Sequence, residues 1–119
     1  MEKSKSFKDL KIWQKGIEIV KDIYSLTNKF PKDELYGLTS QMRRSSISIP
    51  SNIAEGFKRS YKKEYKQFLH ITLGSLAELE TQLIIAKELG YIKDVELNYI
   101  AEKIDHEAKM VTSYSNKLD

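Results

Sequence analysis

The sequence predicts an all-α protein, an up-down-up-down bundle of four helices that forms one domain over residues 1–119. Apolar residues recur at spacings of three and four through four long stretches, as in helices that bury one face. Five glycines and two prolines leave few places where the chain can turn, so the connections are expected to be short. With 40% hydrophobic and 31% charged residues, the composition fits a soluble domain with a single core.

The first helix is expected over about residues 6–28. Ser6 can cap its start, and the carboxylate of Asp9 would lie near the positive end of the helix. Pro31 ends it, because proline disfavours helical geometry in the residue before it. Its apolar face is wide, which indicates a broad core face or, as the alternative, a face used in part between chains. That face combines two stripes: Leu10, Trp13, Ile17, Val20 and Tyr24, and Ile12, Ile19, Ile23 and Leu26.

The second helix is expected over about residues 33–57, with Pro50 in its interior. An interior proline removes one backbone hydrogen bond and costs around 3 kcal/mol. The chain either continues through Pro50 with a kink, or stops and restarts with Asn52 and Glu55 as a capping box. We predict one helix kinked at Pro50, because the apolar positions stay in phase across it: Met42, Ile49 and Ile53.

The third helix is expected over about residues 60–89 and the fourth over about residues 94–117. Gly56 suits the end of the second helix, since glycine takes a positive φ without steric cost, and Ser60 can cap the third. Gly90 closes the third helix, and Asp94 starts the fourth. The apolar stripes are Tyr65, Leu69, Thr72, Leu76, Leu79 and Leu83, and then Leu97, Ile100, Ile104, Ala108 and Val111.

No pattern in the sequence is typical of an enzyme, a metal site or a cofactor site. The chain has no cysteine, and His70 and His106 lie on different predicted helices outside any metal-binding spacing. A minor alternative is an enzyme in which Glu55 and Glu78, with an Arg, perform acid–base chemistry. Helix capping and solvated surface positions explain these carboxylates more simply. We therefore expect no catalytic activity, no metal and no cofactor.

Positive charge is concentrated in the middle of the chain. Residues 41–73 hold seven Lys or Arg against Glu55 and Glu64, a net charge of +5, whereas residues 74–119 carry −4. Cations neutralise phosphates, and nearby rings such as Tyr61 can stack on bases, so this segment suits nucleic acid. The alternatives are a solvated helix face and, for the two Arg residues, pairing with acids of a neighbouring helix or subunit. The candidate nucleic-acid-binding residues are Arg43, Arg44, Lys58, Arg59, Lys62, Lys63 and Lys66.

The N-terminal segment is charged and lacks the apolar stretch of a signal peptide. No run approaches the roughly 18 apolar residues that a membrane helix needs. These features favour a cytoplasmic protein without a membrane partner.

A distinctive run, Pro-x-Asn-Ile-Ala-Glu-Gly, extends from Pro50 to Gly56. Further residues that carry a family resemblance are Phe7, Leu10, Trp13, Pro31, Glu34, Tyr36, Gly37, Gln41, Arg43, Arg44, Ser48, Phe68, Leu69, Gly74, Leu76, Glu78 and Thr81. With these residues the chain resembles, over nearly its whole length, the four-helix-bundle proteins named for open reading frames in intervening sequences of bacterial 23S ribosomal RNA genes.

The resemblance implies a bundle that assembles as a homo-oligomer, typically a pentamer, with no assigned enzymatic activity and an undetermined biological role. It also implies a relation to the accessory protein of diversity-generating retroelements, which is similar to a basic pentameric barrel that binds nucleic acid and a reverse transcriptase. The family name records a genomic location and does not itself imply binding to ribosomal RNA.

Two hypotheses about function follow. In the first, a non-catalytic oligomeric bundle binds RNA or DNA through the basic residues named above. In the second, the protein is a homo-oligomeric scaffold or adaptor for a protein partner and binds no nucleic acid. The residues assigned to the family motif and the subunit interface are Gln41, Ser48, Pro50, Asn52, Glu55, Gly56 and Glu78.

Overall fold

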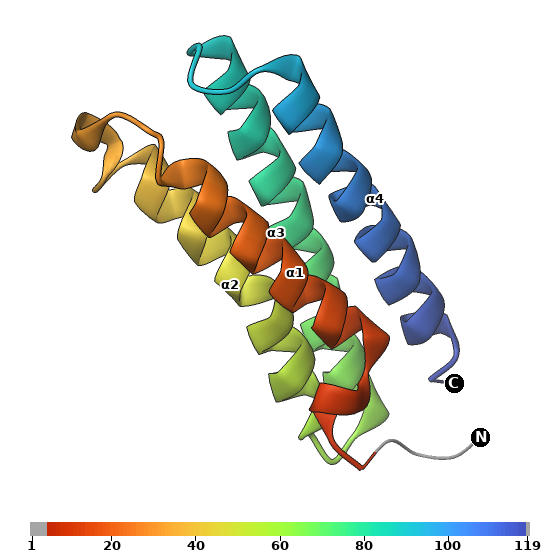
Figure 1. Ribbon diagram of the computed structural model, residues 1–119. Helices are drawn as coiled ribbons and strands as arrows, with labels where there is room; N and C mark the ends of the chain where they lie inside the picture. The colour runs from red at the N-terminus through yellow and green to blue at the C-terminus, as the bar shows by residue number, and fades with distance from the viewer. Residues whose placement is uncertain (1–4, 119) are drawn as a thin grey trace.

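Four helices make up the computed structural model, which describes residues 5–118 (Figure 1). Within that range no residue is in a strand, so the predicted all-α class and four-helix bundle are confirmed. Consecutive helices run in opposite directions and lie side by side, in a body of 46 × 25 × 20 Å. The helices are α1 (Lys11–Thr27), α2 (Leu38–Phe57), α3 (Lys62–Glu88) and α4 (Asp94–Asn116), with 3₁₀ turns η1 (Phe7–Asp9) and η2 (Lys32–Glu34).

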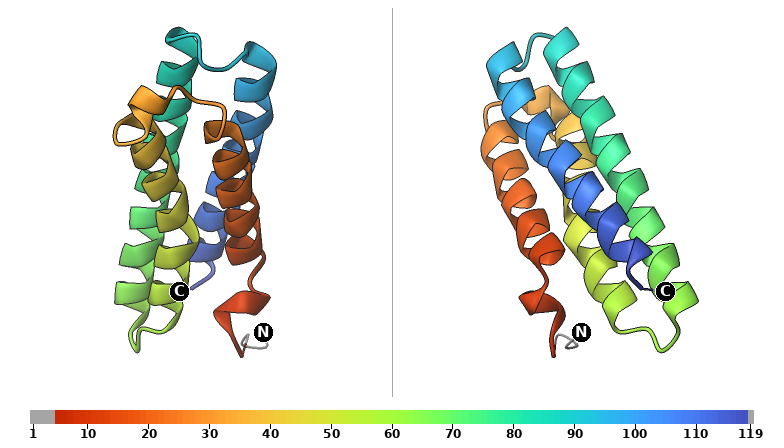
Figure 2. Two further views of the ribbon diagram at one scale, coloured as in Figure 1. Left: turned by 60° about the vertical axis from the view of Figure 1, so that its left-hand side comes forward. Right: turned by 90° about the vertical axis from the view of Figure 1, so that its right-hand side faces the viewer.

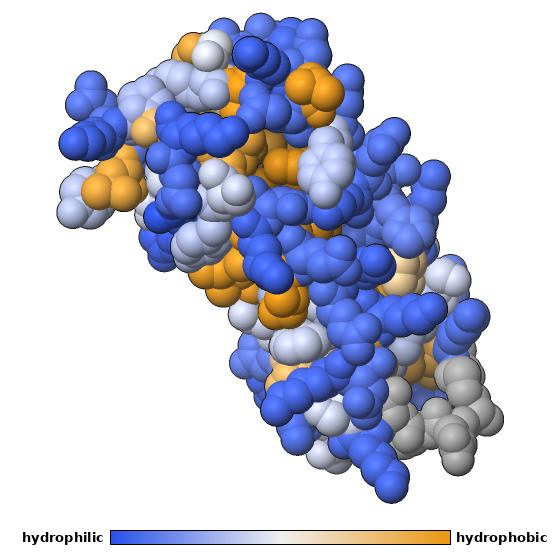
Figure 3. All heavy atoms as spheres, in the orientation of Figure 1, coloured by the Kyte–Doolittle hydropathy of each residue, from blue (hydrophilic) through white to orange (hydrophobic). Residues whose placement is uncertain are grey.

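The core is formed by the apolar stripes that the sequence displays. Each fully buried Leu or Ile contributes about 1.5–3 kcal/mol through removal of its side chain from water. Most of the surface in Figure 3 is hydrophilic, with apolar residues exposed in patches. No helix within residues 5–118 combines the length and apolarity that crossing a bilayer requires. The side chains with 0% exposure include Ile23, Met42, Ile49, Ile53, Leu69, Leu79, Leu83 and Val111.

The predicted starts of the first two helices are wrong. Ser6 accepts a hydrogen bond from the backbone N–H of Lys8, but it caps only η1. Leu10 is extended (ψ 128°) and buried, so α1 begins at Lys11. Residues 32–34 form η2, and α2 begins only at Leu38.

The predicted start of the third helix is also wrong. Helix α3 begins at Lys62 after an extended Tyr61, and no side chain caps it there, so Ser60 is not its cap.

Pro50 lies inside a continuous α2, as predicted, so the helix does not stop and restart there. Its ring is buried against α1, where a Cβ on Gly16 would lie 3.4 Å from the Pro50 Cβ. The glycine therefore lets α1 approach the proline closely. The kink at Pro50 stays a prediction.

Gly56 does not end α2 through a positive φ. Gly90 is the one residue with positive φ in the described part of the chain, at 81°. Gly56 is instead buried against α3, where an added Cβ would lie 2.8 Å from the Cβ of Phe68 and 2.9 Å from a ring carbon of Tyr65. Gly56 therefore permits close packing of α2 on α3.

Gly90 closes α3 as predicted. After it, the N–H of Tyr91 donates to the carbonyl of Ala86 at 2.9 Å, as in a Schellman motif. The Tyr91 hydroxyl then donates to Glu34 at 2.7 Å, and the other Glu34 oxygen accepts from the N–H of Leu38, the first residue of α2. These hydrogen bonds lower the pKa of Glu34, the Tyr91 bond most strongly. They tie the two loops at one end of the bundle together.

Candidate nucleic-acid interface and neighbouring clefts

One end of the bundle gathers cations from segments far apart in the sequence. The turn between α2 and α3 lies at the same end as the start of α1 and the end of α4 (Figure 2). Tyr65 at the start of α3 accordingly donates to Tyr114 near the end of α4 at 2.9 Å. We call this region the basic end. Among residues 5–118, the basic residues in or next to these segments are Lys5, Lys8, Lys11, Lys58, Arg59, Lys62, Lys63, Lys66 and Lys117, and the acids are Asp9, Glu55 and Glu64.

Three lysines of the basic end are exposed and unpaired. Within residues 5–118, the ammonium groups of Lys58, Lys62 and Lys63 take part in no hydrogen bond, ion pair or ring contact. Tyr61 lies between them in sequence with 71% of its surface exposed. Lys66 is half-buried and engaged in an interaction. The turn therefore presents three free cations beside an open aromatic ring.

Arg59 differs from these lysines because it is held by its own chain. Its guanidinium lies 3.5 Å from the carboxylate of Glu55 and 4.8 Å from the ring centre of Phe68. Both partners are at least partly exposed, so this ion pair contributes little stability. Glu55 thus serves as a surface partner of Arg59.

The lysines of the N-terminal segment and Lys117 were missed as candidates in the sequence. They were missed because only the continuous basic segment at residues 41–73 was considered. In the fold, η1 packs on α2, and Lys11 and Lys117 line one cleft with Tyr114. The sequence could have indicated this grouping, because in an antiparallel four-helix bundle the first and third helices start at the same end.

Arg43 lies away from the basic end, on the face of α2 that meets α1. It donates to the hydroxyl of Thr27 at 3.0 Å and to the side-chain carbonyl of Asn28 at 3.1 Å. Its guanidinium also stacks over Tyr24 at 4.6 Å. Arg43 therefore ties the end of α1 to α2, through neutral partners and not through the acids of a neighbouring helix that the sequence suggested. Arg44, by contrast, is exposed.

A groove of about 410 Å³ runs between α2 and α3 on the exposed side of this helix pair. At its base, Ser48 donates to Ser75 at 2.6 Å, and the Asn52 amide donates to the carbonyl of Ser48 at 2.8 Å. Four of the family-motif residues meet in this groove. Its lining residues are Gln41, Arg44, Ser45, Ser48, Asn52, Ile71, Ser75 and Glu78.

The remaining motif residues lie elsewhere. Pro50 packs on α1 and Gly56 packs on α3, so both are buried inside the chain. Glu55 is paired with Arg59 and does not line the groove that contains Glu78. The two carboxylates considered for acid–base chemistry are therefore not brought together. Among the described residues, no group of three His, Cys, Asp or Glu side chains is arranged to hold a metal ion.

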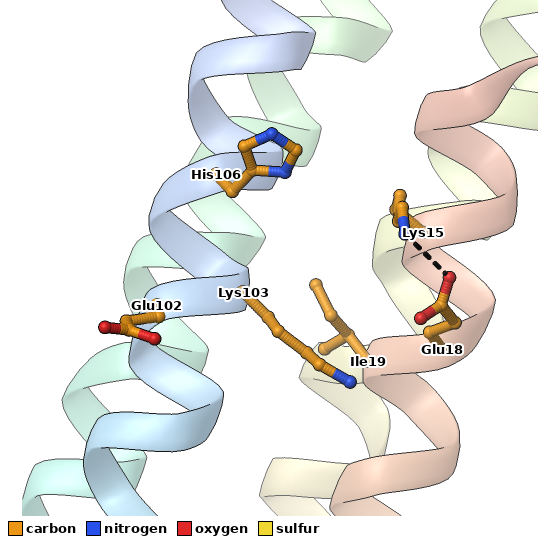
Figure 4. Close-up of a pocket in the computed structure, with 6 residues that line it drawn as sticks. All are labelled: Lys15, Glu18, Ile19, Glu102, Lys103 and His106. Carbon is orange, nitrogen blue, oxygen red and sulfur yellow. Dashed lines mark ion pairs between the residues drawn. The ribbon is translucent and has the colours of Figure 1, made fainter.

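A third cleft, of about 230 Å³, separates α1 from α4 (Figure 4). Its lining includes Lys15 and Glu18, which form an ion pair at 3.2 Å, and Lys103, which donates to Asp22 at 2.8 Å. The Asp22 hydrogen bond raises the pKa of Lys103. Next to the lining residue His106 is Glu107, whose side chain is only 1% exposed. Sequence reasoning passed over Glu107, although it falls on the apolar stripe between Ile104 and Val111.

Comparison with known proteins agrees with this architecture. A family model described as 23S rRNA-intervening sequence protein matches residues 8–113. No curated protein matches the sequence. A crystal structure of a protein with unknown function from the S23 ribosomal protein family of Bacteroides thetaiotaomicron is similar, with a TM-score of 0.82 and 22% identity. The match covers 88% of this chain and 95% of that chain, and it shows a shared fold. Because the family model spans most of the sequence, the chain belongs to the family of 23S rRNA-intervening sequence proteins.

Proposed function

We propose that this protein is a cytoplasmic, non-catalytic bundle that binds RNA or DNA through its basic end. The observation that carries the proposal is a set of exposed cations at the α2–α3 turn, Lys58, Lys62 and Lys63, which pair with no residue in the range 5–118 and lie beside the exposed ring of Tyr61. Free ammonium groups can neutralise phosphates without first breaking an internal ion pair. An exposed tyrosine can stack on an unpaired base, and every base offers a face for stacking.

This arrangement favours binding that depends little on sequence. Lysine contacts to phosphate carry no base information, so affinity should come mainly from counterion release. Arg43 contributes to the proposal only indirectly, because two of its nitrogens already donate to residues of the α1 end and its guanidinium stacks on Tyr24. Lys5, Lys8, Lys11 and Lys117 extend the contact surface beyond the basic segment considered in the sequence.

Reversing three charges at the α2–α3 turn tests the proposal. The variant Lys58→Glu/Lys62→Glu/Lys63→Glu should lose affinity for a structured RNA and a duplex DNA on the order of a hundredfold at low salt, since three phosphate contacts become repulsive. Fluorescence anisotropy measures the affinity. The matched control is Lys21→Glu/Lys32→Glu/Lys93→Glu, which changes the net charge equally at exposed lysines outside the basic end. Equal losses in both variants, or no loss in the first, would contradict the proposal.

As a second candidate function, we propose self-assembly through the α2–α3 groove. Arg44 and Glu78 carry opposite charges, line the same groove, and are in no ion pair within residues 5–118. Ile71 in the groove is 50% exposed. These features suit a second copy of the chain, in which Arg44 of one copy pairs with Glu78 of another while Ile71 is covered.

The charge-swap experiment tests the assembly proposal. Arg44→Glu and Glu78→Arg should each dissociate the oligomer in sedimentation velocity runs, because each places like charges in the interface. The double variant should restore assembly. Glu80→Arg, an exposed position on α3 outside the groove, should leave the oligomer intact. A monomeric wild type, or an oligomer unaffected by either single change, would overturn this second candidate.

A further inference from the structure

Among residues 5–118, Glu107 is the one charged residue that is buried, with 1% of its surface exposed. It occupies a core position on α4, and neither carboxyl oxygen has a hydrogen-bond partner in the part of the chain that the structure describes. An ionised carboxylate without partners in an apolar interior is strongly disfavoured, because it loses its hydration without compensation. Glu107 is therefore accommodated here as the neutral acid.

The α1–α4 cleft is lined by the residue that precedes Glu107. Its lining includes the preceding residue His106 and, across from it, Lys15 and Glu18 of α1 (Figure 4). The contact between α1 and α4 is the least extensive between adjacent helices of the bundle. We call this contact and its cleft the α1–α4 seam. Separation of helices should cost least at this seam.

The electrostatic surroundings of Glu107 come from α1 and from burial. Burial raises the pKa of Glu107 to about 8, the Lys15 ammonium opposes this rise, and the Glu18 carboxylate adds to it. No charged group of α2 or α3 contributes to the shift in the described part of the chain. On α4 itself, Lys103 is engaged with Asp22. Lys15 is thus the cation available to an ionised Glu107.

We propose that the α1–α4 seam is a proton-controlled gate: loss of the Glu107 proton draws water from the cleft, and Lys15 from Glu18, to the Glu107 carboxylate. A cleft of about 230 Å³ has room for several water molecules, each of which occupies roughly 30 Å³ in the liquid. Lys15 is 48% exposed and sits on a flexible stem, so it can exchange one carboxylate for another. Hydration of the buried carboxylate separates α1 from α4, while the exchange places Lys15 beside the new negative charge.

Spin-label distances report directly on the seam, and the absence of native cysteine makes labelling selective. One label pair, Lys21→Cys and Lys109→Cys, joins exposed positions on α1 and α4. The Lys109→Cys change removes the exposed ion pair between Lys109 and Asp105, which costs little stability. The control pair, Ser51→Cys and Gln67→Cys, joins α2 and α3. Labelled chains are diluted into unlabelled protein, so that only distances within one chain are measured.

Between about pH 6 and about pH 10, the α1–α4 distance should lengthen and broaden with a midpoint near pH 8, while the α2–α3 distance stays constant. In the Glu107→Gln background the α1–α4 distance should stay short throughout. In the Lys15→Gln background the midpoint should move to higher pH, because the cation that favours the ionised acid is gone. A constant wild-type distance, or the same change in Glu107→Gln, would overturn the gate.

Discussion

Replacing Glu107 by Gln should stabilise the protein by about 3 kcal/mol at pH 7 and remove most of the pH dependence of its stability between pH 5 and pH 8. In the folded state the pKa of Glu107 is raised from 4.5 to about 8. Between these values the folded state holds a proton that the unfolded state has released. The contribution of the neutral Glu107 to the free energy of unfolding is therefore fully present below about pH 4.5 and falls as pH rises towards 8. An amide of the same shape cannot ionise, so it does not incur this penalty.

Urea unfolding followed by circular dichroism at several pH values measures the difference. The two proteins should have similar stability at about pH 4.5 and diverge progressively up to about pH 8. Glu102→Gln is the matched control, because Glu102 is exposed on α4 and lines the same cleft. The stability of this control should change with pH as the stability of the wild type does. If Glu107→Gln kept the wild-type pH dependence, the buried acid would not be its source.

Gly56→Ala should destabilise the protein by about 1–3 kcal/mol, although alanine is normally the better helix former. An added Cβ would lie 2.8 Å from the Cβ of Phe68 and 2.9 Å from the Tyr65 ring. The Phe68 Cβ is fixed to the backbone of α3, so relief of the contact requires α2 and α3 to move apart. That movement loosens the most extensive helix contact in the bundle.

Gly74→Ala is the control, and here the substitution should raise stability instead of lowering it. Gly74 is exposed within α3, and a Cβ built there meets nothing within 4 Å. This variant should gain about 0.5–1 kcal/mol, because alanine loses less backbone freedom than glycine on forming a helix. Thermal unfolding of both variants measures the signs. Stabilisation by both substitutions would show that α2 and α3 are not in close contact at Gly56.

The sequence predicted the bundle because periodic apolar residues report directly on which helix faces are buried. Met42, Ile49 and Ile53 stay in phase across Pro50, and this phase correctly indicated a continuous α2. Gly90 was also predictable, since a positive φ after a helix is a local property. Helix starts were less predictable. Leu10 turns inward to join the core, a tertiary contact that outweighs the local capping signal of Ser6.

The candidate sites depend on distances between helices, which local patterns do not contain. Gly56 has a favourable local explanation as a helix end, and only the position of Phe68 on α3 shows its packing role. Arg43 and Lys58 are both basic residues of the same segment, yet Arg43 is hydrogen-bonded to α1 whereas Lys58 pairs with no residue in the range 5–118. Glu107 could have been recognised from its place on an apolar stripe. Its lack of partners could not, because that depends on every helix around it.

A salt titration of wild-type binding tests the central claim, that the basic end binds nucleic acid, most directly. Anisotropy with a structured RNA and a duplex DNA over a series of salt concentrations gives the affinity at each. The account predicts a linear fall of log affinity with log salt, with a slope of about −3 or steeper on duplex DNA, since each phosphate contact contributes roughly −0.9. No binding at low salt, or affinity that does not change with salt, would contradict it.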